Sequence, residues 1–104
     1  MGDIKTGIEE DVTTKSREKT DEPSMYKVLL HNDDYTTMEF VVEILKFVFH
    51  KSEERATTIM INVHTKGVGV CGVYTYDIAS TKVNSVHVLA RERGYPLRCS
   101  LEEE

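Results

Sequence analysis

Residues 25–49 decide the fold, and they read MYKVLLHNDDYTTMEFVVEILKFVF. The first seven, 25–31, are rich in β-formers and predict a strand that is buried on at least one face. The polar run at 32–34 predicts a turn, because short polar side chains hydrogen-bond to nearby backbone. A helix should follow, with Thr36 as its N-cap and Glu39 completing a capping box. The buried face of that helix is a stripe at helical spacing, formed by Val41, Ile44, Leu45, Val48 and Phe49.

The rest of the chain supplies two more helices and two more strands. Ser52 is the expected N-cap of a second helix, and Gly67 is its expected C-terminal stop. A strand at 68–74 follows, then a third helix opened by Thr75, and a last strand at 97–101. The order β-α-α-β-α-β predicts an α+β fold, in which a small three-stranded antiparallel sheet carries three helices packed on one face.

Composition limits the chain to a single small domain and excludes several classes of partner. The 104 residues carry a net charge of −5, and seven of the 18 acidic residues lie in the first 24, which contain no aromatic residue. We therefore expect a disordered N-terminal extension at 1–24 and a folded domain at 25–104. The chain shows no basic stripe that would bind nucleic acid or an anionic membrane. No apolar run is long enough to span a bilayer, so we expect a cytoplasmic protein.

The turn at 31–35 is the densest polar cluster of the predicted domain, although such residues equally suit an ordinary turn and helix cap. Its three contiguous oxygen-bearing residues do not follow the alternate spacing of a calcium loop. The four histidines and two cysteines show no zinc-ligand spacing. Asp33 and Asp34 have no nucleophile or phosphate-binding loop to work with. We expect no catalytic residue, no metal and no cofactor, and hence no enzyme.

Two methionines suggest a binding pocket instead. Met38 lies in the first turn after the polar cluster, and Met60 is four residues before His64 on one helical face. Methionines at such positions are often ordinary core residues. If the two helices pack together, however, Met38, Val41 and Met60 line an apolar cavity beside Asn32, Asp33 and His64. An oxygen-rich rim over such a cavity suits a ligand that has a cation next to a large apolar group.

Seven runs of residues carry a resemblance to a known family. In order, they are residues 26–36 (YKVLLHNDDYT), 38–41 (MEFV), Val63-His64 with Gly67, residues 70–74 (VCGVY), Thr81-Lys82, residues 90–92 (ARE) and Pro96-Leu97. From about Met25 to Leu101 the chain resembles ClpS, the bacterial N-end-rule adaptors. The resemblance implies an adaptor that binds proteins with N-terminal Leu, Phe, Tyr or Trp and delivers them to the Hsp100-class ATPase ClpA for degradation by ClpP.

The resemblance also implies roles for individual residues. It assigns the substrate's α-amino group to Asn32, Asp33 and His64, and it places Asp34 and Thr36 beside the substrate backbone. The hydrophobic side-chain pocket maps onto Met38, Val41, Met60 and Leu97, and the ATPase-docking face maps near Asp77 and Lys82. We further expect a monomer in isolation and a role for the N-terminal extension in delivery.

Two departures from the common ClpS pattern are visible. Thr37 stands where many members have proline, and both residue types suit a first helical turn. Ser80 stands where glutamate is frequent, which weakens the docking-face assignment. An alternative is a partner-docking module of the same fold without specificity for N-terminal residues, similar in shape to the C-terminal domain of the ribosomal stalk protein. Binding of peptides with free and acetylated N-termini separates the two hypotheses.

Overall fold

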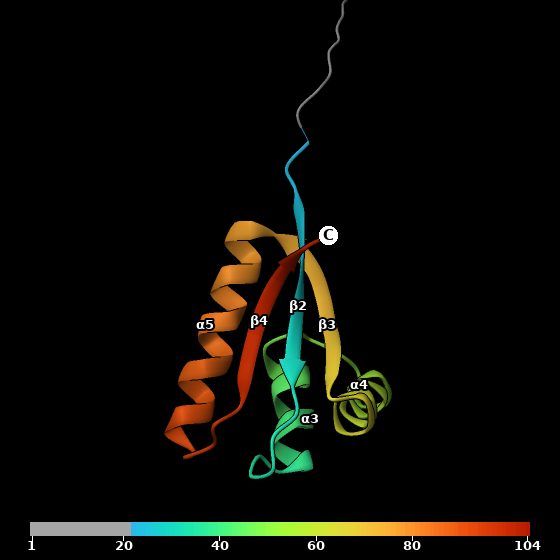
Figure 1. The fold of residues 1–104 in the computed structure, drawn as a ribbon, viewed down its shortest axis with the longest axis vertical. Helices are drawn as coiled ribbons and strands as arrows, with labels where there is room; N and C mark the ends of the chain where they lie inside the picture. The colour runs from blue at the N-terminus through green and yellow to red at the C-terminus, as the bar shows by residue number, and fades with distance from the viewer. Residues whose placement is uncertain (1–21) are drawn as a thin grey trace, which may run out of the picture.

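A three-stranded antiparallel sheet forms one layer of the structure, and helices form the other (Figure 1). The computed structural model describes residues 22–104. Its elements in chain order are β2 (Met25–His31), α3 (Met38–Phe47), α4 (Glu53–Lys66), β3 (Val68–Thr75), α5 (Tyr76–Glu92) and β4 (Arg98–Glu103). The predicted order and fold class are confirmed. The predicted N-terminal extension lies outside the described residues, apart from residues 22–24, which have no regular secondary structure.

The sheet is built around β2, which pairs with β3 on one side and β4 on the other. The β2–β3 register shifts between Val28, which pairs with Gly72, and Leu29, which pairs with Val70, so that Cys71 is the extra residue of a bulge. At the far end of β2, His31 pairs with both Val68 and Arg98. The chain therefore leaves the sheet as the polar turn at the end where β3 and β4 begin.

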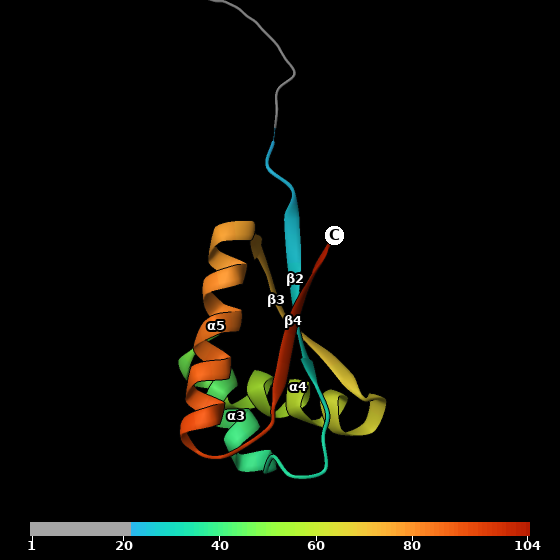
Figure 2. The ribbon, with the colours of Figure 1, turned by 60° about the vertical axis from the view of Figure 1, so that its left-hand side comes forward.

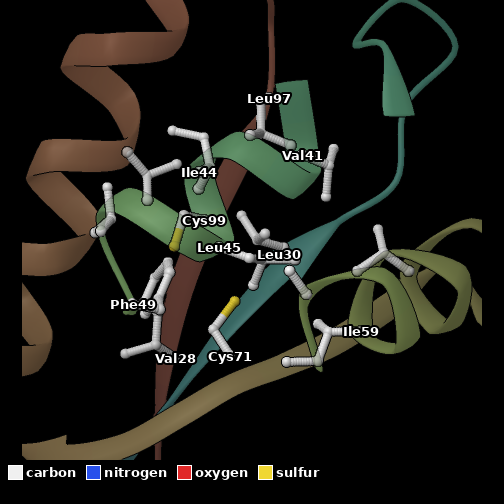
Figure 3. Close-up of a cluster of buried hydrophobic side chains, with 14 of the residues drawn as sticks. Val28, Leu30, Val41, Ile44, Leu45, Phe49, Ile59, Cys71, Leu97 and Cys99 are labelled. Carbon is white, nitrogen blue, oxygen red and sulfur yellow. The ribbon is translucent and has the colours of Figure 1, made fainter. Parts of the chain in front are cut away.

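The hydrophobic core fills the space between the sheet and the helices (Figure 3). Val28 and Leu30 from the central strand meet the buried stripe predicted for the first helix, of which Leu45 is 0% exposed. Figure 2 shows α3, α4 and α5 beside the strands, with α5 running along the sheet. None of the described helices is long and apolar enough to cross a membrane.

The ends of the helices follow the predicted signals with one correction. Ser52 caps α4 by accepting a hydrogen bond from the backbone N–H of Arg55, and Gly67 ends that helix with a φ of 89°. The N-cap of α3 is Thr37, whose hydroxyl accepts from the N–H of Phe40, and the prediction of Thr36 was wrong by one residue. The reason is that the backbone and hydroxyl of Thr36 are both engaged by Asp33.

Two histidines outside the predicted binding site, His31 and His87, hold β4 in place. The Nε2 of His87 on α5 accepts the backbone N–H of Cys99 at 3.0 Å, and the Nε2 of His31 lies 2.7 Å from the hydroxyl of Ser100. Burial lowers the pKa of both imidazoles, and the positive charge of Arg98 lowers each of them further. The folded state therefore favours the neutral form of both imidazoles.

We expect the free energy of unfolding to fall as the pH is lowered below about 6.5. The folded state resists protonation of His31 and His87, whereas the unfolded chain takes up these protons. The contribution of the two histidines to the free energy of unfolding is thus fully present above the pKa of histidine in the unfolded chain, and it decreases below that pKa. Urea unfolding at about pH 7.5 and 5.5 measures the effect. In His87→Gln the amide oxygen can still accept from Cys99, so the loss between the two pH values should be smaller. An unchanged pH dependence in this variant would contradict the assignment.

Candidate functional site

A cavity of about 580 Å³ opens between the polar turn, the start of α3 and the last turns of α4. Its lining comes from three segments that are adjacent in space because α3 and α4 pack together. The lining residues are Asn32, Asp33, Asp34, Tyr35, Thr36, Thr37, Met38, Glu39, Val41, Met60, Val63 and His64. The structure thus brings together all three residues expected to hold an ammonium group and three of the four expected to form the apolar pocket.

A backbone contact fixes the turn against the end of α4. The N–H of Asn32 donates to the carbonyl oxygen of Gly67 at 2.9 Å. Gly67 follows the last turn of α4, which carries the exposed His64. The two halves of the polar rim, one from the turn and one from the helix, are therefore positioned relative to each other by main-chain atoms.

Asp33 is the organising residue of the turn. Its Oδ1 accepts the backbone N–H groups of Tyr35 at 2.8 Å and Thr36 at 2.7 Å, and its Oδ2 accepts the hydroxyl of Thr36 at 2.7 Å. Partial burial alone would raise the pKa of Asp33, but these hydrogen bonds and the charge of Arg91 outweigh it and lower the pKa below its ordinary value. A carboxylate that is ionised and fixed in this way presents a stationary negative charge at the cavity.

The opposite side of the cavity is apolar. Val41 and Val63 are buried at its wall, whereas Met38 is 46% exposed and Met60 is half-buried. A methionine can adapt its three side-chain torsions to a ligand, which suits a pocket that accepts several apolar groups. Val63 and Glu39 were not proposed as site residues from the sequence, although Val63 lies next to His64 on the apolar stripe of the helix.

Leu97 is the one predicted pocket residue that the structure does not bring to the cavity. It is 1% exposed and belongs to the hydrophobic core, where it lies beside Val41 (Figure 3). It stands behind the apolar wall rather than on its surface. Asp34 and Thr36, predicted beside a substrate backbone, both line the cavity, and Thr36 also donates its hydroxyl hydrogen to Asp33.

The two residues assigned to ATPase docking lie apart from the cavity, near the start of α5. Asp77 is exposed in the first turn of that helix. The ammonium group of Lys82 donates to the carbonyl oxygen of Val48 at 2.7 Å and lies over the rings of Phe49 and Tyr74. Lys82 therefore also stabilises the fold, which limits what its substitution reveals about docking.

The arrangement can bind a cation and an apolar group that are attached to each other. The fixed Asp33 carboxylate, with Asn32 and His64 near it, is at one end, and methionine and valine side chains are at the other. Within the part of the chain that the structure describes, no three His, Cys, Asp or Glu side chains are grouped so that they could hold a metal ion.

Comparison with known proteins gives consistent matches. Residues 21–100 match the family model described as ATP-dependent Clp protease adaptor protein ClpS. A relative from Syntrophus aciditrophicus, named ATP-dependent Clp protease adapter protein ClpS, is 55% identical over 97% of this chain and 94% of its own length. The protein of the same name from Lawsonia intracellularis is 63% identical over 84% of this chain and 80% of its own length. The solved structure of Agrobacterium tumefaciens ClpS2 bound to L-phenylalaninamide is similar with a TM-score of 0.78 and 43% identity, covering 80% of this chain and all of that one.

Proposed function

This chain belongs to the ClpS family of Clp protease adaptors, which are not enzymes, and from that membership we propose that it binds proteins through a free N-terminal α-amino group and a bulky first side chain. The preferred first residues are Leu, Phe, Tyr and Trp. The bound protein is handed to the Hsp100-class ATPase ClpA for degradation by ClpP.

The observation that carries the proposal is the convergence of Asn32, Asp33 and His64 on a cavity that Met38 and Met60 also line. The Agrobacterium relative provides independent support, because phenylalaninamide combines a free α-amino group with an aromatic side chain. In the proposed complex, the α-ammonium donates to the Asn32 side-chain oxygen, the Asp33 carboxylate and a ring nitrogen of His64.

The expected binding free energy suits an adaptor that binds a substrate and later releases it. Each charge-assisted hydrogen bond to the ammonium contributes about 1.5–3 kcal/mol, and burial of a Leu or Phe side chain contributes a similar amount. Loss of translational and rotational freedom and ordering of the peptide offset much of this gain. We expect a Kd of roughly 1 µM, which lets the adaptor hold a substrate and still give it up.

Fluorescence anisotropy with labelled peptides tests the proposal. Peptides that begin with Phe or Leu should bind, and the same Phe peptide with an acetylated N-terminus should not, because acetylation removes the charge and two of the three donors. Peptides beginning with Arg should bind weakly. Equal binding of the free and acetylated Phe peptides would overturn the proposed α-amino recognition and favour a docking module without N-terminal specificity.

Met38 should determine selection by side-chain shape. It lies in the first turn of α3 at the cavity and is placed to crowd a first residue that is branched at Cβ. N-terminal Ile and Val should therefore bind more weakly than Leu. Met38→Ala should raise the affinity for Ile relative to Leu, as measured by anisotropy with matched peptides. A Leu-to-Ile affinity ratio equal to that of the unchanged chain would show that Met38 does not set this preference.

Delivery to the ATPase is the second half of the proposed function. We assign docking to the surface near Asp77 and Lys82, and we assign a step after docking to the N-terminal extension. Deleting residues 1–20 should spare peptide binding, because no lining residue of the cavity is removed. Degradation of a Phe-initiated substrate by ClpA and ClpP should then be lost. Full degradation with the truncated adaptor would contradict the role given to the extension.

A further inference from the structure

An apolar groove of about 420 Å³ lies between α3 and α5, outside the proposed substrate cavity. Its lining residues are Phe40, Glu43, Ile44, Phe47, Leu89, Glu92 and Arg93. Phe47 is 73% exposed, and Leu89 is 37% exposed on the facing helix. Among residues 22–104 only Tyr35, at the substrate cavity, is a more exposed large hydrophobic side chain. An apolar groove with such exposed side chains is the kind of surface that takes part in an interaction.

The wall and rim of the groove are fixed by a local ion pair. Arg93 contacts the carboxylate of Glu43 at 3.2 Å across the gap between the two helices, and its guanidinium lies over the ring of Phe40. The groove therefore presents apolar side chains along its floor and both signs of charge at its edge. That is the surface that an amphipathic helix with mixed charges recognises.

The chain contains one segment outside the described residues with the matching pattern. Apart from Met1, the only aliphatic side chains of residues 1–21 are Ile4, Ile8 and Val12, which recur at intervals of four and so lie on one stripe of a helix. Beside this stripe the segment carries one basic residue, Lys5, and three acidic residues, Glu9, Glu10 and Asp11.

The connection is long enough for this segment to reach the groove. Met25 pairs with Thr75, which directly precedes α5, and Leu89 lies 13 residues into that helix, or about 20 Å along its axis. The residues between Val12 and Met25 can span about 40 Å when extended. Because the segment is tethered, its effective concentration at the groove is of millimolar order, so weak contacts suffice for occupancy.

We propose that residues 4–12 of this chain dock as a short amphipathic helix in the groove between α3 and α5, with Ile4, Ile8 and Val12 facing Phe47 and Leu89. A helix of this length is marginal alone in water, so helix formation accompanies docking. The occupant is the chain's own segment, and release of the segment would expose both it and the groove.

Amide NMR spectra of the full-length chain test the docking. The double variant Ile4→Ser with Ile8→Ser should shift the amide signals of Ile44, Phe47 and Leu89. The control is Thr6→Ser with Thr14→Ser, at positions that lie away from the apolar stripe on a helix, and it should leave these signals in place. In the reciprocal experiment Phe47→Ser should shift the signals of residues 4–12. Ile61→Ser, which replaces another exposed apolar side chain outside the groove, should not. Unchanged groove signals in the first variant would overturn the proposal.

A spin label provides a second measurement. Cys71 and Cys99 are 1% and 3% exposed, and burial raises the pKa of both thiols, so a nitroxide reagent will react selectively at Thr14→Cys. The amide signals of Phe47 and Leu89 should lose most of their intensity, while those of Val68 and Val70 on the sheet should keep theirs. Broadening that disappears on dilution would assign the groove to a second copy of the chain, and absence of broadening would exclude docking. Neither result depends on peptide binding at the cavity.

Discussion

Peptides that begin with Phe should bind the Asp33→Asn variant roughly 10–100-fold more weakly than the unchanged chain. The substitution keeps the size of the side chain, removes its charge and replaces one of its two acceptor oxygens with an amide donor. In the unchanged chain the carboxylate is held by hydrogen bonds from Tyr35 and Thr36, so it meets a ligand ammonium without first having to be ordered. Loss of a charge-assisted hydrogen bond and of the accompanying electrostatic attraction accounts for the expected size of the effect.

The neighbouring carboxylate provides the matched control. Asp34 lines the same cavity and is exposed, so Asp34→Asn changes the net charge equally at almost the same place. We expect it to weaken binding by much less. Circular dichroism and urea unfolding of both variants will show whether the turn is retained. Equal weakening by the two substitutions would mean that the cavity attracts the ammonium through its general negative potential and not through a specific contact with Asp33.

Leu97→Ala should lower the free energy of unfolding by about 2–5 kcal/mol, a large fraction of the stability of a domain of this size. Leu97 is 1% exposed and packs in the core beside Val41, so truncation leaves a cavity that its neighbours cannot fill completely. Urea unfolding measures the loss, and Leu97→Met, which nearly conserves volume, should cost less than about 1.5 kcal/mol.

The same variant decides whether Leu97 also belongs to the substrate pocket. If Leu97 only supports the cavity wall from the core and does not contact the peptide, the folded fraction of Leu97→Ala should bind Phe and Leu peptides with the affinity order of the unchanged chain. A nearly unchanged unfolding free energy together with an altered order among first residues would place Leu97 on the pocket surface instead. Peptide titrations without urea, at a temperature where the variant is folded, separate the two outcomes.

Local signals were sufficient to predict most of the fold. Met25–His31 was identified as a strand from its β-formers, and Gly67 as a helix end because a glycine can take up the positive φ that a C-terminal cap requires. The N-cap of α3 was assigned to the wrong threonine. The capping-box pattern favours Thr36, because only Thr36 has a glutamate three positions later, but Asp33 engages Thr36 and leaves Thr37 to cap the helix.

The site was predictable where it depends on adjacent residues and on helical spacing. Asn32 and Asp33 are neighbours, and Met60 and His64 lie one helical turn apart, so their grouping requires only that α3 and α4 pack together. Leu97 could not be placed in this way, because its position depends on how the end of α5 returns to the sheet. Likewise, the sequence gives no sign that His87 accepts the N–H of Cys99, since 12 residues and a change of direction separate them.

The hydrogen bond between the N–H of Asn32 and the carbonyl of Gly67 has a consequence for altering what the cavity accepts. Because this joint between the turn and α4 is made by main-chain atoms, the joint itself does not depend on the side chains at positions 38, 41 and 60. Residues at 38, 41 and 60 can therefore be exchanged in combination to build libraries of binders for other terminal residues. The proposed acceptors of the amino group would keep their positions, so such libraries should yield reagents that recognise the first residue of a protein.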